Sequence, residues 1–134
     1  MTLKKSYKGF ILWMIGFLAA IFAVAFIPSE DEMLPMRLIM LVMAWGMASL
    51  AWLIWRTESV YWYNTTSYED AVAAGQERRK EFARRHMLIF WRFALLMTAV
   101  SILLTLLAWS AWIDFAFGTV GLVVACVCTT PVKL

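Results

Sequence analysis

The sequence predicts an all-α fold in one domain, residues 1–134: a polytopic membrane protein with four transmembrane helices and a cytoplasmic helical extension before the third. Two observations carry this prediction. Hydrophobic residues make up 63% of the chain and charged residues only 16%, whereas soluble domains carry about 25% charged residues. The hydrophobic residues also fall into four long runs, and a chain this short cannot bury so much apolar surface in a water-soluble core. Lipid is therefore the expected solvent for most of these side chains.

The first helix is predicted over residues 9–27, a run without charge. At 1.5 Å per residue it rises about 28 Å, which is enough to cross the hydrocarbon core. Pro28 should end it, because the residue before a proline disfavours the helical conformation. A basic segment precedes the run, and residues 23–25 resemble a signal-peptide cleavage site. Because the run continues past that site to Ile27, we expect it to stay as a membrane helix.

The second helix is predicted over residues 36–55, after an acidic connector that contains Glu30, Asp31 and Glu32. Pro35 suits its first turn, where the missing N–H costs nothing. Trp52 and Trp55 near its end are typical of a membrane–water interface, where an amphipathic ring meets the headgroups.

Residues 56–86 form the one long polar segment and link the two apolar halves. Ser67 followed by Asp70 resembles a capping box, and Thr66 followed by Glu69 does so as well. Acidic residues open the helix that follows and basic residues fill its later turns, which suits the helix dipole. We expect a helix from about Ser67 that runs on into the membrane and bends, if at all, where it enters.

The third and fourth membrane helices are predicted over residues 87–109 and 112–129, with a tight connection between them. Pro131 should stop the last helix. Of the twelve Lys and Arg residues, Arg37 alone falls on the side opposite the termini and the central loop, and Arg92 lies within a helix. This bias predicts a protein of the cell membrane whose termini and central loop are cytoplasmic.

The central loop carries a basic group that is expected to contact anionic lipid headgroups, each residue contributing about 1 kcal/mol near the surface. Its members are Arg78, Arg79, Lys80, Arg84 and Arg85. The first interpretation is a topology signal with some attraction to lipid. Nucleic acid is the disfavoured alternative, because acidic residues interrupt the group and it lies beside the membrane.

Arg92 and Asp114 are the charges whose environment the sequence leaves open. A guanidinium within an apolar helix is costly unless it is paired or wet. Arg92 is therefore expected to extend toward the headgroups, or else to lie between helices and bind an anionic lipid or a partner carboxylate. Asp114 is expected to be a solvated charge in the first turn of its helix, with pairing to Arg37 as the alternative.

Small and weakly polar residues recur at helical spacing on the last two helices. They include Thr98, Ser101, Thr105, Gly118 and Gly121. Such stripes allow helices to approach closely and to hydrogen-bond, so helix packing is the first interpretation. The alternative is that the stripe lines a path through an oligomer.

Nothing in the sequence predicts an enzyme, a cofactor or a metal site. Nucleophilic catalysis needs a base beside the nucleophile. The chain offers only His86 as a histidine, and Cys126 and Cys128 point to different faces of one helix.

One family resemblance lies at the central loop. Tyr63-Asn64-Thr65, then Ser67, a charged helix and a pair of membrane helices resemble a group of small bacterial membrane proteins that are similar to the SdpI-type immunity proteins. The resemblance covers about the last half of the chain and departs from the family at Trp62, where a glycine usually stands. It implies a bacterial membrane protein with an immunity or signalling role, and it transfers no catalytic residue.

The expected function is that of a non-catalytic membrane protein, an accessory subunit or an immunity or sensor component acting through helix contacts. A larger membrane protein or a second copy is the expected partner. The alternative is a small oligomeric transporter or channel, with Arg92 and the polar stripe along its path. No helix carries an acidic residue at its midpoint, which disfavours proton-coupled transport.

Overall fold

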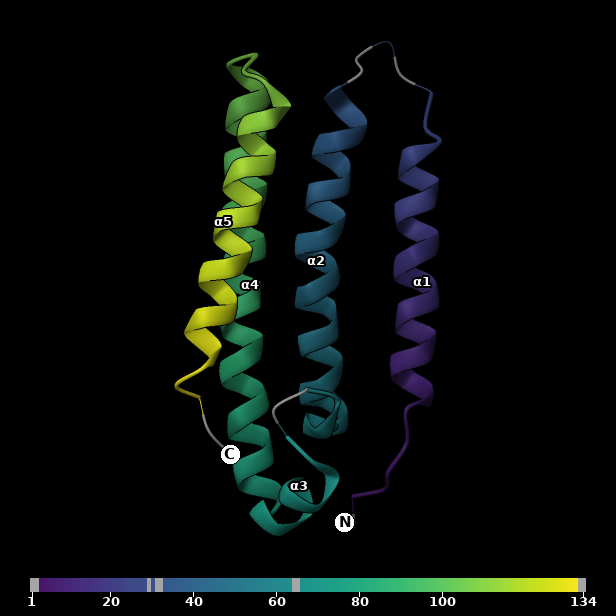
Figure 1. Ribbon diagram of the computed structural model, residues 1–134, viewed down its shortest axis with the longest axis vertical. Coiled ribbons are helices and arrows are strands. Elements are labelled where there is room, and N and C mark those ends of the chain that lie inside the picture. Colours follow the sequence, from purple (N-terminus) through teal and green to yellow (C-terminus); the bar gives the residue numbers. More distant parts are fainter. Residues whose placement is uncertain (1–2, 29, 31–32, 64–65, 133–134) are drawn as a thin grey trace.

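The computed structural model describes residues 3–28, 30, 33–63 and 66–132, and this part of the chain is helical without strands. Four of its helices are long and apolar enough to cross a membrane, which confirms the predicted fold class. They run along one another in Figure 1, with α3 lying across one end. Leu3 and Val132 pack into one cluster beside α3, so the first and last described residues share an end of the bundle. We call it the terminal end, and the opposite end the hairpin end.

The helices are α1 (Lys8–Ala25), α2 (Met33–Thr57), α3 (Tyr68–Ala74), α4 (Gln76–Leu106) and α5 (Ala111–Thr129), with a short 3-10 helix, η1, over Val60–Trp62. α1 ends two residues before its predicted limit, as the restriction on the residue before Pro28 requires. α2 starts three residues before residue 36 and takes Pro35 into its first turn. The predictions on Asp31, Glu32, Asn64, Thr65 and Lys133 lie outside the described residues.

The extension before the third membrane helix is not the continuous helix that the sequence predicts. Ser67 caps α3 as expected, since its Oγ accepts a hydrogen bond from the Asp70 N–H at 3.0 Å. Gly75 then has φ of +84°, a left-handed conformation that interrupts a right-handed helix and that glycine adopts without steric cost. α4 starts at Gln76 and runs into the apolar stretch without interruption. The break in the helix is at Gly75, about three turns before the apolar stretch begins at Met87.

Two helix ends use left-handed residues other than glycine. Glu58 follows α2 with φ of +59°, and Ala108 follows α4 with φ of +54°. In each case the next N–H bonds a carbonyl five residues back, from Ser59 to Ile54 and from Trp109 to Leu104. These are Schellman ends, where glycine is the usual residue. Both place a group against an arginine of another helix, as described below.

The membrane core lies between α2, α4 and α5. Small residues of α2 such as Ala44 and Ala48 face large ones of α4 such as Phe90 and Met97, all of them buried. α1 packs mainly on α2 and, although it is described throughout, has no buried residue. In Figure 1 it stands on the side of α2 away from α5. The tight core is therefore a three-helix unit with α1 attached at its flank.

Gly118 and Gly121 let α5 approach this core. A Cβ at Gly118 would lie 2.3 Å from Met40 Cε, and one at Gly121 would lie 2.7 Å from Phe93 Cε2. Both distances are shorter than those that real Cβ atoms make. The two glycines therefore serve the close packing of helices within this chain.

A second cluster at the terminal end fixes the segment before α1. The Tyr61 hydroxyl accepts a hydrogen bond from the Ser6 N–H at 2.8 Å, and Trp62 Nε1 donates to the Ser6 carbonyl at 3.0 Å. The Tyr68 hydroxyl donates to the Leu3 carbonyl at 2.6 Å. Aromatic residues of η1 and α3 therefore hold residues 3–6 against the central loop.

Candidate functional site

A buried ion pair joins α2 and α5 at the hairpin end. Arg37 Nε lies 3.4 Å from Asp114 Oδ1, and the two side chains are 8% and 0% exposed. Arg37 also donates to Thr105 Oγ1 at 2.7 Å and to the carbonyl of Trp109. The expectation of a solvated Asp114 is wrong, and the alternative pairing is correct. The reason is geometric: both residues lie about one turn inside their helices, on the faces that meet.

This pair is incompletely hydrogen-bonded. Neither carboxylate oxygen of Asp114 nor Nε of Arg37 has a hydrogen-bond partner among the described residues, although all three atoms are buried. The pair is held by charge attraction and by the two donors that Arg37 gives to α4 and its following turn. Because removal from water costs both ions solvation, each charge depends on the other.

The polar stripe of α4 faces α2. Trp45 Nε1 donates to Thr98 Oγ1 at 2.8 Å, and Thr98 donates to the Ala94 carbonyl at 2.8 Å. Ser101 is 3% exposed, and Thr105 receives Arg37. The stripe is therefore bonded to α2 and to its own backbone.

Arg92 lies on a different face of α4. It is exposed and makes no hydrogen bond or ion pair within the part of the chain that is described. At 100° per residue it stands about 120° to 180° around the helix from Thr98, Ser101 and Thr105. Arg92 therefore lies on the outside of the bundle and not between this chain's helices.

The basic group of the central loop divides into buried and exposed members. Arg79 is 5% exposed; its Nη1 donates to the Ala71 carbonyl at 2.9 Å, and its Nη2 lies 3.4 Å from Glu58 Oε1. Sequence reasoning missed this pair, which joins α4 to the turns after α2 and within α3. The exposed members are Arg78, Lys80, Arg84 and Arg85, the last two bonded to Glu81.

Replacement of Arg79 by methionine is expected to lower the free energy of unfolding by about 2 kcal/mol or more. It leaves the buried Ala71 carbonyl without its donor and Glu58 without its counter-charge. Lys80→Met is the matched control, because Lys80 is the exposed neighbour and should change stability by less than about 0.5 kcal/mol. Unfolding of both variants in mild detergent, titrated with dodecyl sulfate, measures the difference. Equal losses would mean that Arg79 acts only as one more surface charge.

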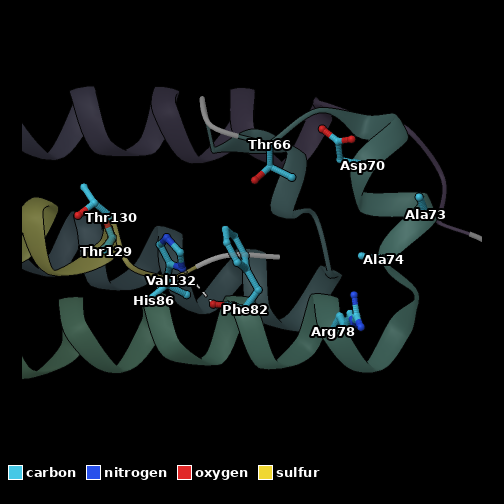
Figure 2. Close-up of a pocket in the computed structure, with 10 residues that line it drawn as sticks. All are labelled: Thr66, Asp70, Ala73, Ala74, Arg78, Phe82, His86, Thr129, Thr130 and Val132. Carbon is cyan, nitrogen blue, oxygen red and sulfur yellow. Dashed lines mark hydrogen bonds between the residues drawn. The ribbon is translucent and has the colours of Figure 1, made fainter.

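A pocket of about 600 Å³ opens at the terminal end. Figure 2 shows it between α3, the first turns of α4 and the end of α5, with His86 near Thr129 and Thr130 and Arg78 near α3. Arg78, Phe82 and His86 are spaced by four and so share one face of α4. They come from the polar start of the helix, before the apolar stretch begins at Met87.

His86 is the most buried polar residue of this pocket, at 5% exposed. Its Nδ1 lies 3.0 Å from the Phe82 carbonyl oxygen. A carbonyl only accepts, so Nδ1 carries the proton, and Nε2 of the neutral ring is an acceptor. The ring lies 4.5 Å from that of Tyr63 and 4.3 Å from that of Phe82, which fixes its orientation. Burial raises the pKa of the Tyr63 hydroxyl beyond its usual range.

The described residues contain no group of three His, Cys, Asp or Glu side chains that would hold a metal ion. Cys126 and Cys128 are free and exposed on α5. The arrangement supplies helix contacts, a buried ion pair and a polar pocket. No family model, curated protein or solved structure matches this chain.

Proposed function

We propose that this chain is a non-catalytic integral membrane protein that acts through helix contacts, as an accessory subunit or an immunity or sensor component. The observation that carries the proposal is a contrast between the three core helices and α1. Where α2, α4 and α5 face one another, polar groups are paired within the chain, as in the hydrogen bond of Trp45 with Thr98 and the ion pair of Arg37 with Asp114. α1 by contrast has no buried residue and leaves much of its apolar surface without cover from this chain.

The partner contact is assigned to the groove between α1 and α2. The groove has a volume of about 410 Å³ and is lined by Gly16, Ala20, Trp45 and Gly46, among others. A Cβ built at Gly16 meets no atom within 4 Å, so Gly16 faces open space there. Small residues allow the backbone of another membrane helix to approach closely. The occupant is a transmembrane helix of a larger protein or of a second copy.

The terminal end is placed in the cytoplasm of a cell whose plasma membrane the protein spans. The positive-inside bias supports this orientation, because Lys and Arg concentrate at the terminal end and Arg37 is isolated at the hairpin end. The exposed basic residues Arg78, Lys80, Arg84 and Arg85 then lie beside anionic headgroups. An immunity or signalling role is consistent with the resemblance at Tyr63 and Ser67.

A transport path along Arg92 and the stripe is less well supported. A shared path needs these groups to face one cavity, whereas Arg92 and Ser101 lie about 180° apart around α4. An Arg92→Leu variant should therefore leave any ion or solute flux of reconstituted protein unchanged.

The proposal is tested by photo-crosslinking in intact cells. A photoreactive phenylalanine analogue at Leu12, which is 70% exposed on α1, should give a discrete adduct of higher mass. The matched control is the same analogue at Val120, which is 63% exposed on α5 and should react mainly with lipid. Intact-mass measurement after gentle detergent extraction then distinguishes a second copy from a larger partner. The same pattern of adducts at both positions would contradict an α1-directed contact.

A further inference from the structure

We infer that the pocket at the terminal end binds a small water-soluble polyol phosphate, of the sugar-phosphate class, with its hydroxyls toward His86 and its phosphate toward Arg78. The pocket has the volume of a small-molecule site, which is about 300–1,000 Å³. Three separate helices contribute its polar walls. The inference does not depend on α1 having a partner.

The end of the pocket near the membrane offers acceptors. His86 is 5% exposed, and its Nδ1 is committed to Phe82. Nε2 has no partner among the described residues. The lone pair of this nitrogen can accept a hydrogen bond from a ligand hydroxyl that enters the pocket.

Thr129, the last residue of α5, and Thr130 just after it add acceptors at the same end. The Thr129 hydroxyl donates to the Cys126 carbonyl at 2.6 Å, and the Thr130 hydroxyl donates to the Val127 carbonyl at 2.7 Å. With their protons used in this way, both oxygens present only lone pairs to the pocket. Among the described residues, no carboxylate lines this end, so neutral hydroxyls match it better than an ammonium group does.

The opposite end carries an available cation. Arg78 lies eight residues before His86, about 12 Å along α4, and has no ion pair or hydrogen bond within the described ranges. Asp70 lines the same end, but its carboxylate accepts from Ser67 at 2.8 Å and forms no ion pair with Arg78. A guanidinium free of a protein carboxylate is suited to a phosphate oxygen, and Asp70 can accept a further hydroxyl.

The order of these groups distinguishes a soluble ligand from a lipid. In a phospholipid the phosphate lies closer to the acyl chains than the rest of the headgroup does. A lipid entering from the membrane would therefore place its phosphate at the acceptor-rich end, beside His86 and Thr129, and far from Arg78. His86 and Arg78 lie at opposite ends of the pocket (Figure 2). A polyol phosphate that enters from the aqueous side brings its hydroxyls to His86 and its phosphate to Arg78.

The test uses the full chain in phosphatidylcholine nanodiscs, with glucose 6-phosphate as the probe in calorimetric titrations. Saturable one-to-one binding is expected, with glucose alone and inorganic phosphate alone each binding at least tenfold more weakly. Arg78→Gln should weaken binding of glucose 6-phosphate by about tenfold or more, the usual effect of losing a charged hydrogen bond. Lys80→Gln makes the same charge change outside the pocket and should have no effect.

The acceptor-rich end is tested with His86→Phe, which keeps a ring and removes Nε2. Thr129→Val makes the same test with little change of shape if His86→Phe does not fold. Either variant should weaken the binding of glucose 6-phosphate and of glucose, and leave the binding of inorganic phosphate unchanged.

Three results would overturn the inference. The first is the absence of saturable binding at probe concentrations up to about 10 mM, well above the range of specific sites. The second is an equal loss in Arg78→Gln and Lys80→Gln, which would indicate general charge attraction. The third is loss of probe binding when phosphatidylglycerol replaces phosphatidylcholine in the nanodisc, which would identify a lipid headgroup as the occupant.

Discussion

Asp114→Ala is expected to lower the free energy of unfolding by about 3–5 kcal/mol, the usual effect of breaking a buried ion pair. The substitution leaves the guanidinium of Arg37 buried without its counter-charge. Arg37 still donates to Thr105 and to the Trp109 carbonyl, so it is held in place and cannot easily turn outward to the headgroups. The loss therefore falls on the contacts of α2 with α4 and α5.

The double variant Arg37→Met/Asp114→Leu separates loss of charge from loss of packing. Because no uncompensated ion remains, its stability should return to within about 1 kcal/mol of the original chain, or exceed it. Glu81→Ala is the control, since Glu81 is an exposed carboxylate bonded to Arg84 and Arg85, and exposed pairs contribute little to stability. Unfolding in mild detergent measures all three. A double variant as unstable as Asp114→Ala would show that side-chain shape, and not charge, holds this end together.

The four membrane helices could be predicted because lipid leaves the backbone few options. A chain segment in hydrocarbon must satisfy its own N–H and C=O groups, so a long apolar run without charge forms a helix. The ends next to Pro28, Pro35 and Pro131 lie within three residues of the predicted limits, because proline acts locally, whereas α4 begins at Gln76, eleven residues before residue 87. The cap at Ser67 is local as well, and it too was confirmed.

The contacts between helices could not be read from the sequence in the same way. Pairing of Arg37 with Asp114 depends on the rotation of α2 and α5 about their axes, and a shift of one residue turns a side chain by about 100°. Arg79 looked like one of five similar cations, yet it alone faces Ala71 and Glu58. Its neighbour Lys80 is exposed for the same geometric reason.

One sequence signal for the pocket was present but weak. Arg78, Phe82 and His86 recur at a spacing of four within a polar segment, which places them on one face of a helix. Nothing local indicates that this face meets α3 and the end of α5. The fold back of α3 depends on Gly75, whose positive φ lets the chain reverse and bring Asp70 over α4.

Gly46→Ala and Gly16→Ala are expected to change stability in opposite directions, although both replace a helix glycine by alanine. A Cβ at Gly46 would lie 2.3 Å from Phe17 Cε2 and 2.6 Å from its Cδ2. The Phe17 ring is stacked on Trp13, with 5.0 Å between centroids, so it has little freedom to turn aside. Alanine at this position should therefore push α1 away from α2 and cost about 1–3 kcal/mol, the usual range for overpacking.

A Cβ at Gly16 meets nothing within 4 Å in the isolated chain. Gly16→Ala should therefore raise the free energy of unfolding by up to about 1 kcal/mol, because alanine has a higher helix propensity than glycine. Both variants are compared by unfolding in mild detergent. A gain at both positions would mean that Phe17 moves freely, and hence that α1 is not seated on α2 as described. A loss at Gly46 with a gain at Gly16 would place the rigid contact at Gly46 and leave the surface of α1 around Gly16 open to a second helix.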